Sequence, residues 1–129
     1  MNITDEHIEK AKLHTTYSLC PAHHEHPDCI RIAVEWLSAQ QWVKRPNRQG
    51  NPIKHVIEIW GGRYISQSDV EVAAVLLGLE GRYPNFNISS KLTRPSMSRL
   101  GTIGEALKHK NYLFKDSYDS MYARLEARP

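Results

Sequence analysis

At 129 residues, with 40% hydrophobic residues, the chain is long enough for one domain with its own core and too apolar for a wholly disordered protein. Its net charge of +3 is modest, so charge alone identifies no partner. The longest apolar run, residues 72–79, is far too short to cross a bilayer. We therefore expect a cytoplasmic protein with no membrane partner, whose cysteines stay reduced or bind metal.

The charges are unevenly distributed along the chain. Residues 1–40 carry three basic and six acidic side chains, a balance of −3. Residues 82–115 carry seven basic side chains against Glu105 alone, a balance of +6. A surface with such an excess of positive charge attracts polyanions.

The first predicted helices lie before residue 44. A helix over residues 4–12 begins at Thr4, which is a good N-cap, although its apolar stripe is thin. A clearer helix begins after Asp28 as its cap, with apolar residues at i, i+3, i+4 and i+7 from Ile30 onward. Residues 44–52 follow as an exposed loop rich in turn formers and positive charge.

Two further helices are predicted in the middle of the chain. Residues 52–60 form one, with Asn51 as its cap and a Gly-Gly pair at its end. The next begins at Ser66 or Ser68, because Ser68-x-x-Glu71 has the spacing of a capping box. These helices should supply most of the core.

The last third of the chain predicts shorter elements. We expect a short helix over Asn87–Thr93, a helix from Thr102 to about Lys110, and a last helix from Asp116. A small β-hairpin fits near Tyr64 or at residues 112–114. The predicted fold is therefore mainly α: a compact single-domain bundle of five to seven short helices, with a small hairpin as in a winged-helix variant. Its parts are a helix and a polar His/Cys loop (1–27), a helical core (28–81), a basic segment (82–115) and a C-terminal helix (116–129).

The stretch CPAHHEHPDC has the residue types of a metal site. Cys20-x-x-His23 and His26-x-x-Cys29 each have the spacing of a zinc knuckle, and zinc prefers thiolate and imidazole ligands. Only two residues separate the pairs, which makes a four-ligand site cramped. Zinc bound by these four side chains is the only cofactor that the sequence indicates.

Two other interpretations of this stretch stay open. His23-His24-Glu25 matches the H-x-E half of the zinc deaminase signature, but no cysteine follows Cys29 to complete it. A cysteine nucleophile beside a histidine is also conceivable. The preferred interpretation is a solvated loop that leads into the helix after Pro27.

The basic segment predicts a nucleic-acid interface. Binding to phosphates needs several cations on one surface, and single-stranded bases stack on exposed aromatic rings such as those of Tyr83, Phe86, Tyr112 and Phe114. The alternative is that these rings belong to the core and the cations to an ordinary solvated face. The predicted contact residues are Arg82, Ser89, Ser90, Lys91, Arg94, Arg99, Lys108 and Lys110.

A helix-turn-helix is one form that this interface could take. Residues 87–93 would then lie in the major groove of DNA. The connection from Gly78 to Phe86 is longer than the usual tight turn, so only a degenerate or winged form fits.

We expect a small nucleic-acid-binding protein, with DNA favoured over RNA. The alternative is a protein-interaction module, such as an inhibitor or adaptor, in which the acidic and basic parts contact different partners or pair in a homodimer. A further alternative is a regulatory protein stabilised by zinc. The sequence contains no Walker A loop, no G-x-G-x-x-G, no G-x-S-x-G and no H-E-x-x-H, so nothing in it predicts an enzyme.

Overall fold

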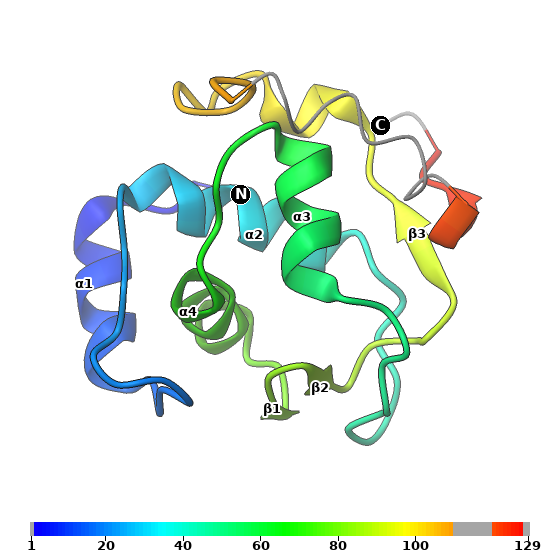
Figure 1. Ribbon diagram of the computed structural model, residues 1–129, viewed down its shortest axis with the longest axis horizontal. Helices are drawn as coiled ribbons and strands as arrows, with labels where there is room; N and C mark the ends of the chain where they lie inside the picture. The colour runs from blue at the N-terminus through cyan, green and yellow to red at the C-terminus, as the bar shows by residue number, and fades with distance from the viewer. Residues whose placement is uncertain (1, 110–119, 128–129) are drawn as a thin grey trace.

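The computed structural model describes residues 2–109 and 120–127, and within them the protein is mainly α with a few short strands (Figure 1). The described residues contain four α-helices, fewer than the predicted five to seven. None of these helices has the length and apolar character needed to span a bilayer. The elements are α1 (Asp5–Leu13), α2 (Pro27–Ser38), α3 (Ile53–Gly61), α4 (Gln67–Leu77), β1 (Gly81–Arg82), β2 (Asn85–Phe86), β3 (Leu92–Arg94), the 3₁₀ helix η1 (Met97–Leu100) and β4 (Tyr122–Leu125).

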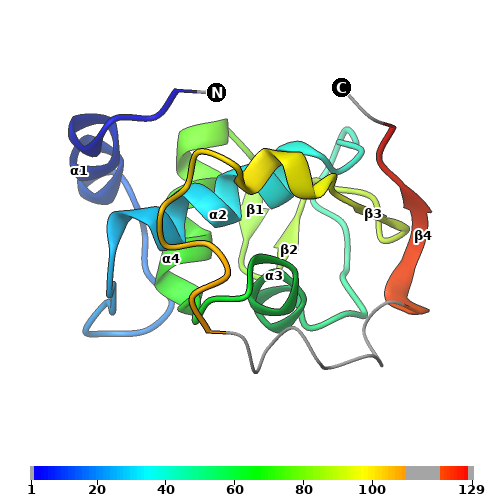
Figure 2. The ribbon, with the colours of Figure 1, turned by 90° about the horizontal axis from the view of Figure 1, so that it is seen from above.

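The core is built around α2, which lies at the centre of both ribbon views with α1 on one side and the β3–β4 pair on the other (Figures 1 and 2). This helix packs against α1, α3, α4 and η1. Ile30, Ala33 and Leu37 are fully buried on its inner face, which confirms the predicted stripe. Full burial of a large aliphatic side chain contributes about 1.5 to 3 kcal/mol to folding, so this helix is central to stability.

The helices α2 and α3 approach each other closely at Gly61. A Cβ atom at this position would lie 2.6 Å from Cγ2 of Ile32, so only glycine fits without displacement. The next residue, Gly62, adopts the left-handed conformation with φ 59° and ends α3. The predicted Gly-Gly stop is confirmed, and the first glycine also permits close packing.

The caps of three helices differ from those predicted. The N-cap position of α3 is Pro52 rather than Asn51, and no side chain caps this helix. His26, rather than Asp28, caps α2, and its Nδ1 accepts a hydrogen bond of 2.9 Å from the Asp28 amide. The capping box of α4 consists of Ser66 and Asp69, not of Ser68 and Glu71. Both side chains of the second pair are therefore available for contacts with other parts of the chain.

The segment after α4 is extended, so the predicted helix over Asn87–Thr93 is wrong. It begins with the β1–β2 hairpin, continues through an isolated bridge between Ile88 and Trp42, and ends in β3. The Val43 amide donates to the Asn87 carbonyl over 2.9 Å, and the side chain of Asn87 bonds the backbone again. These long-range hydrogen bonds replace helical ones in a stretch of Asn, Ser and Thr with weak helix propensity. No recognition helix forms from these residues.

The carboxy-terminal part also differs from the prediction. Residues 102–109 form turns, not the predicted helix, and the amides of Leu107 and His109 donate to the carbonyls of Gly61 and Gly62 over 2.7 Å each. Residues 122–125 form β4, which pairs in parallel with β3. The predicted last helix is therefore wrong over its described end, while its start and the possible hairpin at residues 112–114 lie outside the described residues. Tyr64 is not in a strand.

Candidate functional site

The Cys/His loop is docked on the amino-terminal end of α4. The hydroxyl of Ser66 donates to the His23 carbonyl over 2.5 Å, and the hydroxyl of Ser68 accepts from the His23 amide over 3.1 Å. His24 Nδ1 lies 2.7 Å from Oδ1 of Asp69, which is 1% exposed. The loop is thus an ordered part of the fold, held by polar side chains from a segment more than 40 residues away in sequence.

A chain of three polar side chains continues from this contact. The ring of His24 bonds Asp69 through Nδ1 and the Tyr17 hydroxyl through Nε2, the latter over 3.0 Å. Burial, followed by the negative charges of Glu71 and Asp69, raises the pKa of Tyr17. The carboxylate orients the imidazole, as in many acid–base sites, and here it also fixes the loop to α4.

The four predicted zinc ligands are not brought together. Cys29 is fully buried in the core on α2, and this burial, followed by the charge of Asp69, raises the pKa of its thiol to about 12. His26 caps α2, His23 packs edge-on against a tyrosine ring, and Cys20 is exposed. Among the described residues, no three His, Cys, Asp or Glu side chains gather in a way that could hold a metal ion.

An ion-pair network that the sequence did not predict joins the same loop to the turns after η1. Arg63 is 6% exposed and bonds Glu25 over 2.8 Å and Glu105 over 3.2 Å. The hydrogen bond from Arg63 lowers the pKa of Glu25. No motif marks Arg63 in the sequence, because its partners come from segments 38 residues before and 42 residues after it.

The predicted phosphate-binding residues do not form one surface. Arg99 is held by Glu35 over 2.9 Å and by Glu126 over 2.5 Å. Lys108 follows the turns after η1, a segment at the top of Figure 1, whereas β1 lies at the bottom of that view. Arg94 is partly buried in β3. Lys110 lies outside the described residues.

Arg82, Ser89, Ser90 and Lys91 fall in the extended segment from β1 to β3. Ser89 is partly buried, its amide donates to the Gln41 carbonyl over 2.7 Å, and its hydroxyl accepts from the Lys91 amide. The side chains of Arg82, Ser90 and Lys91 are exposed. These four residues therefore lie on extended backbone rather than on a helix.

The loop over residues 41–50 runs beside this segment and adds three further cations. The Asn47 amide donates to the Phe86 carbonyl over 3.0 Å, and the Gln49 amide donates to Oδ1 of Asn85 over 3.0 Å. Over residues 41–51 and 80–91 there are five basic residues against Glu80 alone. We call these five the basic surface: Lys44, Arg45, Arg48, Arg82 and Lys91.

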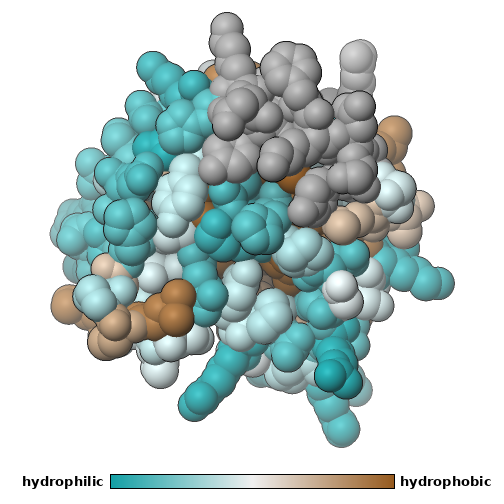
Figure 3. Space-filling model, viewed as in Figure 1, coloured by the Kyte–Doolittle hydropathy of each residue, from teal (hydrophilic) through white to brown (hydrophobic). Residues whose placement is uncertain are grey.

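The cations of the basic surface are available for an external partner. All five side chains are exposed, and within the described part of the chain none of them forms an ion pair. Figure 3 shows long hydrophilic side chains projecting from the lower edge of the molecule, where β1 and the loop lie in Figure 1. Trp42, at the start of the loop, is 46% exposed. The run KRPNRQ was visible in the sequence as a basic loop, but its position beside Arg82 was not.

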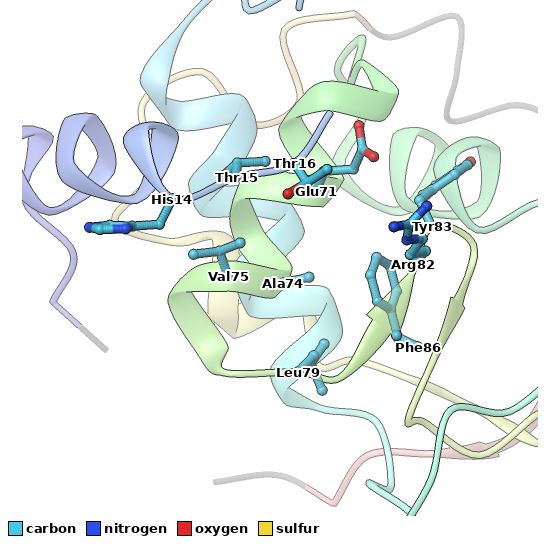
Figure 4. A pocket seen from close by; sticks show the side chains of 11 residues that line it. His14, Thr15, Thr16, Glu71, Ala74, Val75, Leu79, Arg82, Tyr83 and Phe86 are labelled. Carbon is cyan, nitrogen blue, oxygen red and sulfur yellow. The ribbon is translucent and has the colours of Figure 1, made fainter. Parts of the chain in front are cut away.

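A cavity of about 210 Å³ adjoins this surface between the end of α1, the outer side of α4 and the β1–β2 hairpin (Figure 4). Thr16, Glu71, Val75, Arg82 and Phe86 are among the residues that line it. Glu71 is 6% exposed, and its Oε2 accepts hydrogen bonds from the Ser18 amide and hydroxyl. Its Oε1 is buried without a hydrogen-bond partner among the described residues.

Comparison of this chain with models of protein families, with curated proteins and with solved structures finds no match. Functional inference therefore depends on the geometry of its own residues.

Proposed function

We propose that the protein binds single-stranded nucleic acid through the basic surface. The observation that carries this proposal is the pairing of the 41–50 loop with the extended segment from β1 to β3. These two paired segments carry five exposed cations without ion-pair partners among the described residues. Phosphate contacts by lysine and arginine supply most of the affinity of proteins for nucleic acids.

Whether a cation already pairs with a carboxylate distinguishes the basic surface from Arg99. Arg99 already bonds two carboxylates, whose hydrogen bonds raise its pKa, so contact with phosphate would require breaking those pairs. Arg45 and Arg48 are exposed and pair with no carboxylate among the described residues, so both can bond phosphate oxygens without breaking an ion pair. Binding to phosphate therefore costs less at the basic surface than at Arg99.

The preference for single strands rests on Trp42 and on the extended backbone beside it. An indole that is 46% exposed offers a face on which a base can stack, and such stacking tolerates any base. The four helices of the described structure contribute none of the five cations of the basic surface. A helix inserted in the major groove is therefore not the mode of binding that we propose.

The test is fluorescence anisotropy of labelled single-stranded and duplex oligonucleotides over a salt series. Affinity should fall steeply with salt, and the double variant Arg45→Ala/Arg48→Ala should reduce the slope of log K against log salt by about 2. The matched control is Lys10→Ala/Lys108→Ala, which removes the same charge from exposed positions outside the basic surface. Absence of binding at low salt, or an equal loss in the control, would overturn the proposal.

A second candidate function is self-association through an apolar patch. Leu13 is 83% exposed and Leu19 is 56% exposed, and hydrophobic side chains gather at the lower left of Figure 3, over the end of α1 and the loop after it. Exposed apolar clusters of this kind mark protein contacts. Sedimentation over a range of concentrations tests this candidate, because Leu13→Glu should abolish a dimer if the patch forms one.

A further inference from the structure

A further arginine meets the basic surface at Lys91. After this residue the extended segment continues into β3, which lies beside β4 at the right of Figure 2. In the register of this parallel pair, Arg124 of β4 lies opposite Thr93 of β3. Nη1 of Arg124 donates to the Lys91 carbonyl over 3.1 Å and to the Thr93 hydroxyl over 3.3 Å. The guanidinium of Arg124 therefore lies against the backbone of a residue of the basic surface.

These two contacts leave one edge of the guanidinium free. Both acceptors bond Nη1, which carries two protons, and neither Nε nor Nη2 forms a hydrogen bond within the described part of the chain. Nε–H and one N–H of Nη2 point in parallel from the same edge of the planar group, and this fork matches two oxygens of a phosphate. The side chain of Arg124, which is half-buried, is thus held by one nitrogen and offers a bidentate edge with the other two.

The contacts of Arg124 also leave its charge uncompensated. A peptide carbonyl and a hydroxyl are neutral acceptors, and no carboxylate of residues 2–109 or 120–127 pairs with this guanidinium. The carboxylate closest to it in sequence, that of Glu126, is already bound, because Nε of Arg99 donates to both of its oxygens over 2.8 Å and 3.0 Å. Arg124 therefore keeps its positive charge for an external anion.

Three other arginines, by contrast, are committed to ion pairs inside the protein. Arg31 and Arg99 each use all three guanidinium nitrogens and bond two carboxylates. Arg63 also bonds two carboxylates and is 6% exposed. Neutral contacts that hold an arginine at the surface orient its fork in advance, so less conformational entropy is lost when an anion binds. Arg124 has this arrangement and the other three do not.

We propose that Arg124 is a phosphate contact for the single strand that the basic surface binds, with its Nε–Nη2 edge on two oxygens of one phosphate. This inference rests on the proposed function and adds an end to the binding path. The strand runs from the 41–50 loop along the extended segment and past Lys91 to the β3–β4 pair. Arg124 fixes the position of one phosphate there, because the protein sets the orientation of its guanidinium.

The first arm of the test is fluorescence anisotropy of labelled oligo-dT over a salt series. Arg124→Ala should weaken binding about tenfold at low salt and reduce the slope of log K against log salt by about 0.7 to 1. Arg124→Lys keeps the charge but lacks the fork, so it should bind severalfold more weakly with an unchanged slope. The matched control is Lys10→Ala, a lost charge on a side chain of α1 that is 70% exposed, and it should leave the affinity within about twofold of the wild type. An unchanged slope for Arg124→Ala refutes the phosphate contact, and wild-type affinity for Arg124→Lys refutes the bidentate geometry.

The second arm observes the side chain itself, because an arginine that only tied β4 to β3 would leave its free edge unchanged when DNA binds. In ¹⁵N NMR spectra of the wild-type protein, the Nε–H resonance of Arg124, assigned through its loss in Arg124→Lys, should shift when oligo-dT is added. The Nε–H resonance of Arg99, which bonds Glu126, should stay in place. An unmoved Arg124 resonance at saturation overturns the inference. This arm needs no stable alanine variant, so it decides alone if Arg124→Ala fails to fold.

The outcomes separate this inference from the proposed function. If Arg45→Ala/Arg48→Ala weakens binding while both Arg124 variants bind as the wild type does, the basic surface stands and the role of Arg124 falls. If the Arg124 variants weaken binding while Arg45→Ala/Arg48→Ala has no effect, the strand lies on the β3–β4 pair and the proposed basic surface falls. Absence of binding by the wild-type protein at low salt overturns both.

Discussion

Removal of the Asp69 carboxylate should destabilise the protein more than the loss of any exposed acidic residue. This side chain is 1% exposed and accepts two hydrogen bonds. Its Oδ2 accepts from the Ser66 amide over 2.8 Å, closing the capping box of α4, and its Oδ1 contacts His24 Nδ1 over 2.7 Å. Asp69→Ala breaks both contacts at once.

The expected cost can be worked out from these two contacts. Loss of the first contact leaves the buried Ser66 amide without its carboxylate acceptor, while the Ser66 hydroxyl still caps the helix, and costs about 1 kcal/mol. Loss of the second contact leaves a ring nitrogen of His24 unpaired on a side chain that is 14% exposed, which costs about 1 to 3 kcal/mol. The free energy of unfolding should therefore fall by roughly 2 to 4 kcal/mol, out of the roughly 5 to 15 kcal/mol typical of a domain. Asp69→Asn keeps one acceptor and should cost about half as much.

The assay is urea unfolding followed by tryptophan fluorescence, with Glu6→Ala as the control. Glu6 also lies in the first turn of a helix, but its side chain is 79% exposed and pairs only with Lys10 at 3.7 Å, so its loss should change stability by less than about 0.5 kcal/mol. The double variant with His24→Ala should cost clearly less than the sum of the single variants, because the two residues share one contact. A change below about 0.5 kcal/mol for Asp69→Ala, or strict additivity with His24→Ala, would refute the account of the docked loop.

Three further predictions follow from other contacts. Gly61→Ala should lower the free energy of unfolding by about 1 to 2 kcal/mol in urea unfolding, because the added Cβ would lie 2.6 Å from Cγ2 of Ile32. Ile32→Leu lacks that methyl group and should relieve the clash. A Gly61→Ala variant as stable as the wild type would contradict the close approach of the two helices. In thiol labelling of the folded protein, Cys20 should react quickly and Cys29 only after unfolding, because Cys29 is buried with a pKa of about 12; two fast thiols would show that this part of α2 opens. The hydrogen bond from Arg99 lowers the pKa of Glu126 below its ordinary 4.5. The ionised carboxylate therefore stabilises the fold fully above pH 4.5, and this stabilisation is lost as the pH falls through the lower pKa of the folded state. The difference in stability between the wild type and Glu126→Gln, measured by urea unfolding, should therefore shrink from pH 7 to about pH 3, and a constant difference would show that the charge contributes nothing.

The sequence predicted the four helices of the first 80 residues well, because their signals are local. Apolar residues at helical spacing place Ile30 and Leu37 on a buried face, and turn residues such as Gly62 stop a helix through their own backbone conformation. Capping residues were less certain, because Ser66 and Ser68 both satisfy the local pattern and only the position of the docked loop distinguishes them.

The last third was predicted poorly because its conformation depends on distant partners. Residues 87–93 are extended since they pair with the loop over residues 41–50, and residues 122–125 form a strand since β3 offers an unpaired edge. Helical spacing in these segments was a coincidence that tertiary hydrogen bonds overrode.

At the candidate site, too, the sequence determined some features and the tertiary structure decided the others. By itself the sequence determined that the chain carries an excess of cations after residue 82, a basic run from Lys44 to Arg48 and a dense Cys/His loop. Only the tertiary structure decided that Arg99 is neutralised by two carboxylates, that Arg82 lies beside the basic run, and that Glu71 lines a cavity next to it. Charge and residue type are properties of the chain, whereas the partners of a charged group depend on which distant segments the fold brings within a few ångströms.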